Sequence, residues 1–284
     1  MEINAEKVKE LREQSGAGIM DCKRALRETG GDLREAVDYL RKQGIVKAGK
    51  KAGRSAEEGL IGLSVSEDGS GASLVEVNCE TDFVARTDQF QKFVQDLSAA
   101  VLKSQPASLE ELLSEKLARG SVEEELKGLI ARLGENMRVR RFKKVSVNAR
   151  ERERAGAYLH AGSKIGSLIK IRGDKATEEI CRNISMHVAA MQPAYIHREA
   201  VPLAVIDKER EIIAASPELA GKPVQILEKI LNGKLGRYYS DVCLLEQPYV
   251  KDTSGKKTVG QYLKEIDSTA EVLEMVRFQV GGPL

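Results

Sequence analysis

The residue types that most often perform covalent chemistry are sparse in this sequence and do not fall at catalytic spacings. The three histidines lie at positions 160, 187 and 197, so no pair has the i,i+4 spacing that binds a metal on one helix face. The four cysteines are scattered and include no C-x-x-C pair of the kind that holds zinc. No G-x-x-x-x-G-K-[ST] run is present to cradle a phosphate. We therefore expect a protein that is not an enzyme, needs no metal or cofactor and does not bind nucleotide directly.

One short segment could nevertheless act on a partner. Residues 78–84 read Asn-Cys-Glu-Thr-Asp-Phe-Val, which sets an acid beside a large aromatic between an expected strand and an expected helix. In the structural reading, Thr81 or Asp82 caps the helix and Phe83 belongs to the core. In the other reading the segment is a wedge, with Phe83 inserting into a partner and Asp82 contributing charge. The residues alone leave both readings open.

Charge and composition favour a protein partner. The 45 Lys and Arg residues against 43 Asp and Glu leave a formal net charge of +2, so no global field attracts nucleic acid or a membrane. Aromatic residues make up 4% and Trp is absent, which makes base-stacking surfaces hard to build. No apolar run approaches the ~18 residues of a membrane span. The first residues carry neither a signal core nor a transit pattern, and we expect a cytoplasmic protein.

The apolar pattern predicts an α+β fold that begins with a small helical module. Residues 1–46 read as three short helices, broken at Gly16-Ala17-Gly18 and at Gly30-Gly31 and ended by Gly44. A bundle this small has a thin core, so we expect a partner-binding domain tethered to something larger. The basic run that follows, at 47–57, is expected to be the linker. Its charges read as a solvated face, with an acidic partner surface or RNA as alternatives.

Residues 58–147 read as a first core subdomain. Alternating apolar residues at 61–65 and 74–77 around an Asp68-Gly69 turn predict a hairpin. A helix with Phe90 on its apolar face and a returning strand at 137–147 follow. Capping-box patterns are expected to start three helices of the chain, at Asp32 with Glu35, Ser108 with Glu111 and Ser121 with Glu124.

Residues 148–284 repeat this order loosely, which suggests a duplicated core of two α+β subdomains. The expected elements are strands at 157–160 and 165–171, a helix at 177–190 and a closing strand at 272–280. Inserted at about 201–238 are two amphipathic arms around a turn at 217–223, which predict an antiparallel helical hairpin, a coiled coil. A projecting apolar stripe needs a partner for burial, so we expect self-association or partner binding here. The stripe comprises Leu203, Ile206, Ile212, Ile213, Ile226, Leu227, Ile230, Leu231 and Leu235.

Two long motifs resemble the signatures of the elongation factor Ts family. Residues 11–26 (LREQSGAGIMDCKRAL) are similar to its N-terminal signature, and residues 76–85 (EVNCETDFVA) to its second. The similarity continues through residues 160–166, 186–190 and 257–260 and covers nearly the whole chain.

The resemblance implies a guanine-nucleotide exchange factor that binds elongation factor Tu carrying GDP and promotes GDP release. It also implies an N-terminal domain similar to the ubiquitin-associated fold. The segment that intrudes between two helices of the partner and disturbs its magnesium ion is matched here by Thr81, Asp82, Phe83 and Val84. Further contact positions of the family are matched by Arg12, Ile19, Met20, Lys23 and His160.

Two positions depart from the family pattern, and other functions remain open. Ser15 keeps the hydroxyl of the usual Thr, whereas Ile19 stands where Met is common and changes the side chain offered to a partner. The helical module alone would suit a ubiquitin-type adaptor, although that leaves the rest of the chain unexplained. The run at 47–54 would suit an RNA-binding translation factor, whose RNA affinity would depend steeply on salt. An enzyme assembled from dispersed residues is a third reading.

Overall fold

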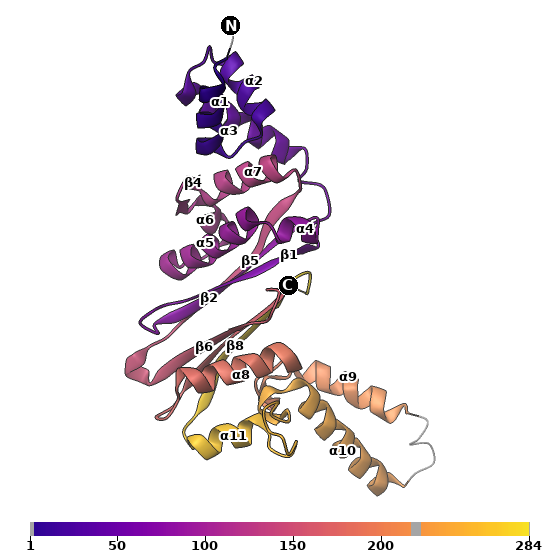
Figure 1. The fold of residues 1–284 in the computed structure, drawn as a ribbon. Coiled ribbons are helices and arrows are strands. Elements are labelled where there is room, and N and C mark those ends of the chain that lie inside the picture. The colour runs from indigo at the N-terminus through magenta and orange to yellow at the C-terminus, as the bar shows by residue number, and fades with distance from the viewer. Residues whose placement is uncertain (1–2, 217–222, 284) are drawn as a thin grey trace.

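The structure is a computed structural model that describes residues 3–216 and 223–283. Figure 1 shows an elongated molecule with the N-terminal helices at one end, two β-sheets with covering helices in the middle and a helical pair projecting at the other end. Both sheets consist of antiparallel strands, and the helices lie outside the sheets. This arrangement confirms the expected α+β class.

Three helices form the N-terminal bundle: α1 (Ala5–Ser15), α2 (Ile19–Glu28) and α3 (Leu33–Gly49). The side chain of Asn4 accepts a hydrogen bond from the Glu6 N–H and caps α1, and Gly16 closes that helix in the left-handed conformation. The bundle buries a small core made of Leu11, Cys22, Ala25, Leu26 and Ala36. Apolar spacing in the sequence therefore located all three helices.

The predicted end of the third helix at Gly44 is wrong. Helix α3 continues to Gly49, so the first residues of the expected linker are helical. Gly44 is buried against α7 (Val122–Leu133), where a Cβ built on it would lie 3.6 Å from the Cβ of Ala131. Packing between α3 and α7 thus outweighs the low helix propensity of glycine. In the basic run, Lys47 pairs with Asp21 at 2.9 Å, so this cation is not a free surface charge.

The first sheet has the order β1-β2-β5, with β1 at Glu58–Val65, β2 at Gly71–Cys79 and β5 at Met137–Ser146. The expected turn at Asp68-Gly69 is present, with Gly69 at a positive φ of 70°. Between β2 and β5 the chain forms the covering helices. These elements are α4 (Asp82–Ala85), α5 (Asp88–Ser104), α6 (Leu109–Ser114), the short strands β3 (Lys116–Leu117) and β4 (Gly120–Ser121), and α7.

The second sheet has the order β6-β7-β8, with β6 at Glu153–Leu159, β7 at Ile165–Arg172 and β8 at Glu271–Gln279. Helix α8 (Glu178–Met191) packs so closely on β6 that a Cβ on Gly156 would lie 2.3 Å from the backbone nitrogen of Arg182. Only glycine fits there. This half also contains α11 (Val259–Ile266), the short 3-10 turns Ala149–Glu151, Arg198–Ala200 and Leu244–Glu246, and two projecting helices described below.

The two sheets face each other and share a buried core. Ile61 and Leu74 from the first sheet pack with Leu168 and Phe278 from the second. Helices α5 and α7 lie outside the first sheet and α8 lies outside the second, so the middle of the molecule has four layers (Figure 1). Strand β2 lies between the sheet interface and the α5 layer, and every one of its residues is buried.

A buried carboxylate ties the C-terminal segment to the first sheet. Glu76 on β2 has no exposed area and accepts hydrogen bonds from Arg140, Arg141 and the backbone N–H of Gly281. Burial disfavours the ionised form, but these hydrogen bonds outweigh burial and hold the pKa of Glu76 below its ordinary value. Arg140 also donates to the carbonyl of Gly282. The charge therefore anchors the segment after β8 across the sheet interface.

The projecting helices are α9 (Leu203–Ala214) and α10 (Val224–Val242). The expected arms are present, although α10 runs four residues beyond the expected limit at Tyr238. Ile206, Ile213 and Leu235 are buried between them. Three residues of the expected apolar stripe are exposed in the free chain: Leu203 (80%), Ile212 (57%) and Ile226 (49%). Of the expected turn at 217–223, residues 217–222 lie outside the described part of the chain.

The expected capping boxes form to different degrees. Ser121 and Glu124 make both reciprocal hydrogen bonds at the start of α7. Asp32 caps α3 by accepting from the Glu35 N–H. Ser108 likewise accepts from the Glu111 N–H, but the Glu111 carboxylate turns to the N–H of Ala107, one residue before the cap. The one-sided caps still satisfy N–H groups that the helix leaves free.

Candidate functional site

The segment at 81–84 forms a single helical turn where β2 leaves the first sheet. Helix α4 spans four residues, and the Thr81 hydroxyl accepts a hydrogen bond from the Val84 N–H at 3.4 Å. This confirms the cap that the sequence predicts. The Cys79 thiol donates to the carbonyl of Thr81 at 3.1 Å, so the cap residue is also held from the strand side. The turn is therefore fixed at its first residue.

Phe83 points away from the core. It is 78% exposed, whereas the next two residues of the same turn, Val84 (8%) and Ala85 (2%), are buried against α5 and the first sheet. The reading that placed Phe83 in the core is wrong, and the exposure expected of a projecting aromatic is confirmed. Val84, which the resemblance places in the contact segment, is buried in the free chain.

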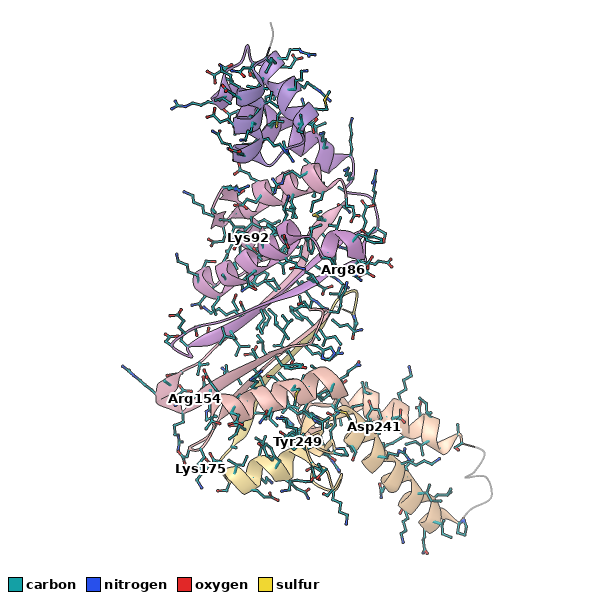
Figure 2. All side chains as sticks on the ribbon, in the orientation of Figure 1. Arg86, Lys92, Arg154, Lys175, Asp241 and Tyr249 are labelled. Carbon is teal, nitrogen blue, oxygen red and sulfur yellow. The ribbon has the colours of Figure 1, made fainter. Side chains whose placement is uncertain are left out.

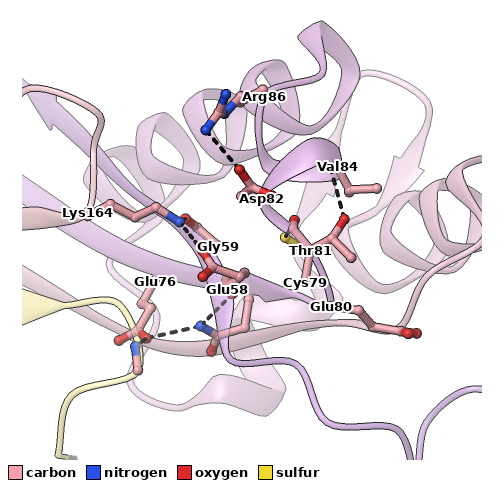
Figure 3. A network of polar contacts seen from close by, with 12 residues as sticks. Glu58, Gly59, Glu76, Cys79, Glu80, Thr81, Asp82, Val84, Arg86 and Lys164 are labelled. Carbon is pink, nitrogen blue, oxygen red and sulfur yellow. Dashed lines mark hydrogen bonds and ion pairs between the residues drawn. The ribbon is translucent and has the colours of Figure 1, made fainter.

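Asp82 lies beside Phe83 and is partly exposed. Its carboxylate pairs with Arg86 at 2.8 Å across one turn, as Figure 3 shows. Nearby, Lys164 reaches Glu58 at 2.5 Å and the carbonyl of Gly59 at 2.9 Å. Each of these ion pairs leaves both partners in contact with solvent. The surface around the exposed ring is thus charged and unobstructed.

A groove of about 780 Å³ runs beside this turn. Its lining joins three parts of the chain that are distant in sequence: α4 with the start of α5, strand β1, and the turn between β6 and β7. Representative lining residues are Asp82, Arg86, Gln91, Ile61, Leu159 and Lys164. Neither Arg86 nor Lys164 was predicted from the sequence as a site residue, although Arg86, labelled in Figure 2, lies four residues after Asp82.

His160 stands at the start of the turn between β6 and β7, whose residues 162–164 line the same groove. Its ring is exposed, and its Nδ1 lies 3.2 Å from the Tyr158 hydroxyl. The second histidine in the sheet region, His187, is instead buried and bonded to Gln247, and burial lowers its pKa. His160 is therefore the histidine of this region that a partner can reach.

The N-terminal candidates form a second surface. Ile19 (53%) and Met20 (70%) are exposed at the start of α2, and Arg12 is exposed on α1. These three line a hollow of about 430 Å³ together with Gln89 of α5. Lys23 is exposed on α2 but lies outside this hollow. The structure thus brings the N-terminal candidates next to α5, the helix that follows the turn carrying Phe83, and leaves His160 at a separate groove.

Two strongly buried thiols are protonated, and the described residues show no cluster of metal ligands. Burial raises the pKa of the thiols of Cys79 and Cys181 to about 12, so neither is a thiolate at neutral pH. Within residues 3–216 and 223–283, no group of three or more His, Cys, Asp and Glu side chains is placed to hold a metal ion. Over the same residues, no helix is long and apolar enough to cross a membrane.

Comparison with known proteins assigns the chain to a family. Residues 80–282 match the family model described as Elongation factor TS. Relatives named Elongation factor Ts occur in Methylococcus capsulatus (46% identical, 99% of this chain, 93% of the relative), Trichlorobacter lovleyi (44%, 100% and 94%) and Thioalkalivibrio sulfidiphilus (43%, 99% and 93%). The family model covers the turn with the exposed phenylalanine, and the alignments with these relatives, over 99–100% of the chain, also cover the N-terminal surface and the whole groove. The chain therefore belongs to the elongation factor Ts family of translation elongation factors.

Proposed function

We propose that this protein binds elongation factor Tu carrying GDP and promotes the release of GDP, so that GTP can replace it. The observation that carries the proposal is the 78% exposure of Phe83 on a capped turn, beside the partly exposed carboxylate of Asp82. Covering a large, water-exposed apolar ring with a partner surface lowers the free energy and so stabilises the complex. Membership of the elongation factor Ts family supports the choice of partner.

The proposed mechanism is differential binding and requires no covalent step. The factor binds the nucleotide-free partner better than the GDP-bound partner, and by linkage factor and GDP weaken each other's binding by the same ratio. Each 1.4 kcal/mol of this difference changes the ratio about tenfold. Phe83 would insert between helices of the partner's nucleotide domain. Asp82 would bring a negative charge towards the magnesium and phosphate site and disturb its electrostatics. Thr81 and Val84 would hold the turn.

Two further surfaces would keep the partners together while the nucleotide leaves. Arg12, Ile19, Met20 and Lys23 would contact the partner's nucleotide domain, and His160 would contact it from the core. The exposure of all five residues supports these roles. Because these contacts do not depend on Phe83, loss of the ring should reduce exchange more than binding.

The finer architecture is also a proposal. Two sheets with the same antiparallel order, each built from a hairpin and a later strand, support a duplicated core with subdomains at 58–147 and 148–284. We propose that the bundle at 1–46 is similar to the ubiquitin-associated fold, with 47–57 as the basic connection. The pair α9 and α10, which forms the hairpin expected at about 201–238 and continues to Val242, would act as a coiled coil for self-association or partner contact. We further propose that the protein acts in the cytoplasm.

The decisive experiment is the release of fluorescently labelled GDP from elongation factor Tu, with and without this protein. We expect a large acceleration that saturates with factor concentration. The same experiment without elongation factor Tu checks that the chain itself does not bind GDP or GTP and does not hydrolyse GTP. Unchanged GDP release in the presence of the folded chain, or micromolar nucleotide binding by the chain alone, would refute the exchange-factor proposal.

A further inference from the structure

The loop between α7 and β5 forms hydrogen bonds with the turn that carries Phe83. Glu135, the residue after the helix-ending Gly134, directs its carboxylate at the segment between β2 and α4. It accepts three hydrogen bonds: from the backbone N–H of Glu80 (3.1 Å), the backbone N–H of Thr81 (3.0 Å) and the Thr81 hydroxyl (2.6 Å). Hydrogen bonds to an ionised acceptor are the stronger class. One carboxylate therefore satisfies every donor of the residue that caps α4.

The same loop is held in return. The Glu80 carboxylate accepts from the Asn136 N–H at 2.6 Å. The side chain of Asn136, which is 6% exposed, donates to the carbonyls of Arg54 (2.7 Å) and Ala52 (3.4 Å). The loop thus joins three segments: the chain that follows the N-terminal helices, the end of β2 and the C-terminal end of α7.

Helix α4 needs such external support. Four residues form one helical turn, which is too short to be stable by itself. Burial of Val84 stabilises the turn, whereas Phe83 is 78% exposed and contributes little to its stability. The direction of the exposed ring therefore depends on where Thr81 is held. The Cys79 thiol donates to the Thr81 carbonyl, and Thr81 itself donates two hydrogen bonds to Glu135, while the neighbouring Glu80 N–H donates a third.

The position of Glu135 is in turn fixed by α7. Gly134 ends that helix in the left-handed conformation, with a φ of 82°, and turns the chain towards β2. The other face of α7 packs on α3 of the N-terminal bundle, where Arg41 pairs with Glu124 at 2.6 Å. Helix α7 and its loop therefore form a continuous physical connection from the N-terminal surface to the turn.

We propose that Glu135 is a positioning residue that holds Thr81 so that Phe83 projects before any partner arrives. Its role in nucleotide exchange rests on the proposed function, but its effect on the turn belongs to the isolated chain. Prepositioning matters because a disordered turn must be ordered during the encounter, which weakens the productive complex. Asn136 connects the same loop to residues 52–54 through hydrogen bonds to the carbonyls of Ala52 and Arg54.

The test uses the absence of tryptophan from the chain. Phe83→Trp introduces a single indole whose time-resolved fluorescence anisotropy reports motion of the turn. Glu135→Gln in this background keeps the size of the side chain but replaces one acceptor oxygen with a donor that cannot bind the N–H groups. The matched control is Glu123→Gln on α7, whose exposed carboxylate pairs with Lys127 one turn away.

We expect Glu135→Gln to increase the amplitude of fast indole motion and to speed hydrogen exchange of the Thr81 amide about tenfold or more, since charge-assisted bonds are lost. The control should change neither. The thermal midpoint of each variant shows that the chain is folded. If indole motion and Thr81 exchange are unchanged in folded Glu135→Gln protein, the proposal is overturned.

A second variant keeps the test decisive if Glu135→Gln does not fold. Thr81→Val keeps the side-chain shape but removes the hydroxyl that donates the 2.6 Å bond to Glu135 and that accepts from the Val84 N–H. It should loosen the turn in the same direction, and absence of any loosening would contradict the proposal. In folded double-variant protein the two changes should be less than additive, because both remove the same contact.

Exchange kinetics then connect the turn to the proposed function. We expect Glu135→Gln to lower the maximal rate of GDP release about three- to tenfold, with little change in the half-saturating factor concentration. An equal maximal rate despite a loosened turn would show that prepositioning is irrelevant to exchange. If the unaltered chain itself fails to accelerate release, the exchange-factor proposal fails, while the anisotropy and hydrogen-exchange results still decide the role of Glu135.

Discussion

Phe83→Ala removes an aromatic ring that the fold scarcely uses. Phe83 is 78% exposed, so roughly one fifth of its area is shielded in the free protein. Complete burial of a Phe side chain is worth about 1.5–3 kcal/mol, so the change should lower the free energy of unfolding by only about 0.3–0.6 kcal/mol. For a chain of this size the thermal midpoint should then fall by less than about 3 °C.

The same change should have a much larger effect on nucleotide exchange. If the partner buries the remaining four fifths of the ring in the state that releases GDP, the lost stabilisation is about 1.2–2.4 kcal/mol. At 1.4 kcal/mol for each factor of ten, this corresponds to about a 7- to 50-fold slower maximal release. The assay is stopped-flow release of labelled GDP from elongation factor Tu over a range of factor concentrations. The half-saturating concentration should change less than the maximal rate.

Phe90→Ala is the matched control. Phe90 lies seven residues further along the chain and has no exposed area, so the same chemical change should cost about 3–5 kcal/mol of stability. Its folded fraction should release GDP at the normal rate. A Phe83→Ala protein that is destabilised as much as a core variant, and whose folded fraction still promotes GDP release at the normal rate, would refute the proposed role of Phe83.

Three other changes have expected outcomes that differ from one another. Asp82→Ala removes an exposed ion pair worth about 0–1 kcal/mol, so stability should hold while GDP release slows less than in Phe83→Ala; unchanged release would exclude a role for the acid. Glu76→Gln should lower the free energy of unfolding by about 2–4 kcal/mol at pH 7, because Arg140 and Arg141 lose their buried counter-charge. Since folding lowers the pKa of Glu76, this contribution is present above the ordinary glutamate pKa and is lost as the pH falls through the lowered value. Urea titrations should therefore show the difference between Glu76→Gln and the unaltered protein shrinking on acidification, and a constant difference would contradict the assignment. Deletion of residues 207–234 should leave both sheets folded by circular dichroism and weaken self-association or the complex with elongation factor Tu in sedimentation experiments; if both persist, the helical pair has no binding role.

Much of the local structure followed from the sequence because its causes are local. The Thr81 cap, the turn at Gly69 and the capping box of Ser121 with Glu124 each depend on residues a few positions apart. Period-2 and period-3.6 apolar patterns likewise located the sheet strands and the long helices, because each element buries one face. The two signature motifs were also sufficient to identify the family, since they are long and occur in the expected order.

Faces and distant contacts were decided only by the tertiary structure. Whether Phe83 points outward depends on how a single helical turn is oriented against β2 and α5. The very next residue, Val84, is buried. In the sequence, Gly44 predicts the end of a helix. In the structure the helix continues past Gly44, because α7 packs on it. Leu203 and Ile212 match the apolar spacing of α9, but the contact between α9 and α10 buries Ile206 and Ile213 and leaves these two side chains exposed.

The residues that hold the site together came from the tertiary structure as well. Glu135 lies 54 positions after Thr81, and Gly281 lies 205 positions after Glu76. No pattern in the sequence marks such pairs, because an isolated acid on a strand or after a helix resembles any solvated charge. The sequence by itself determined which segments become helix and strand and which family they compose. Only the packing of the two sheets and their covering helices decided which side chains are held together and which one is left projecting, because burial and hydrogen bonding depend on three-dimensional neighbours.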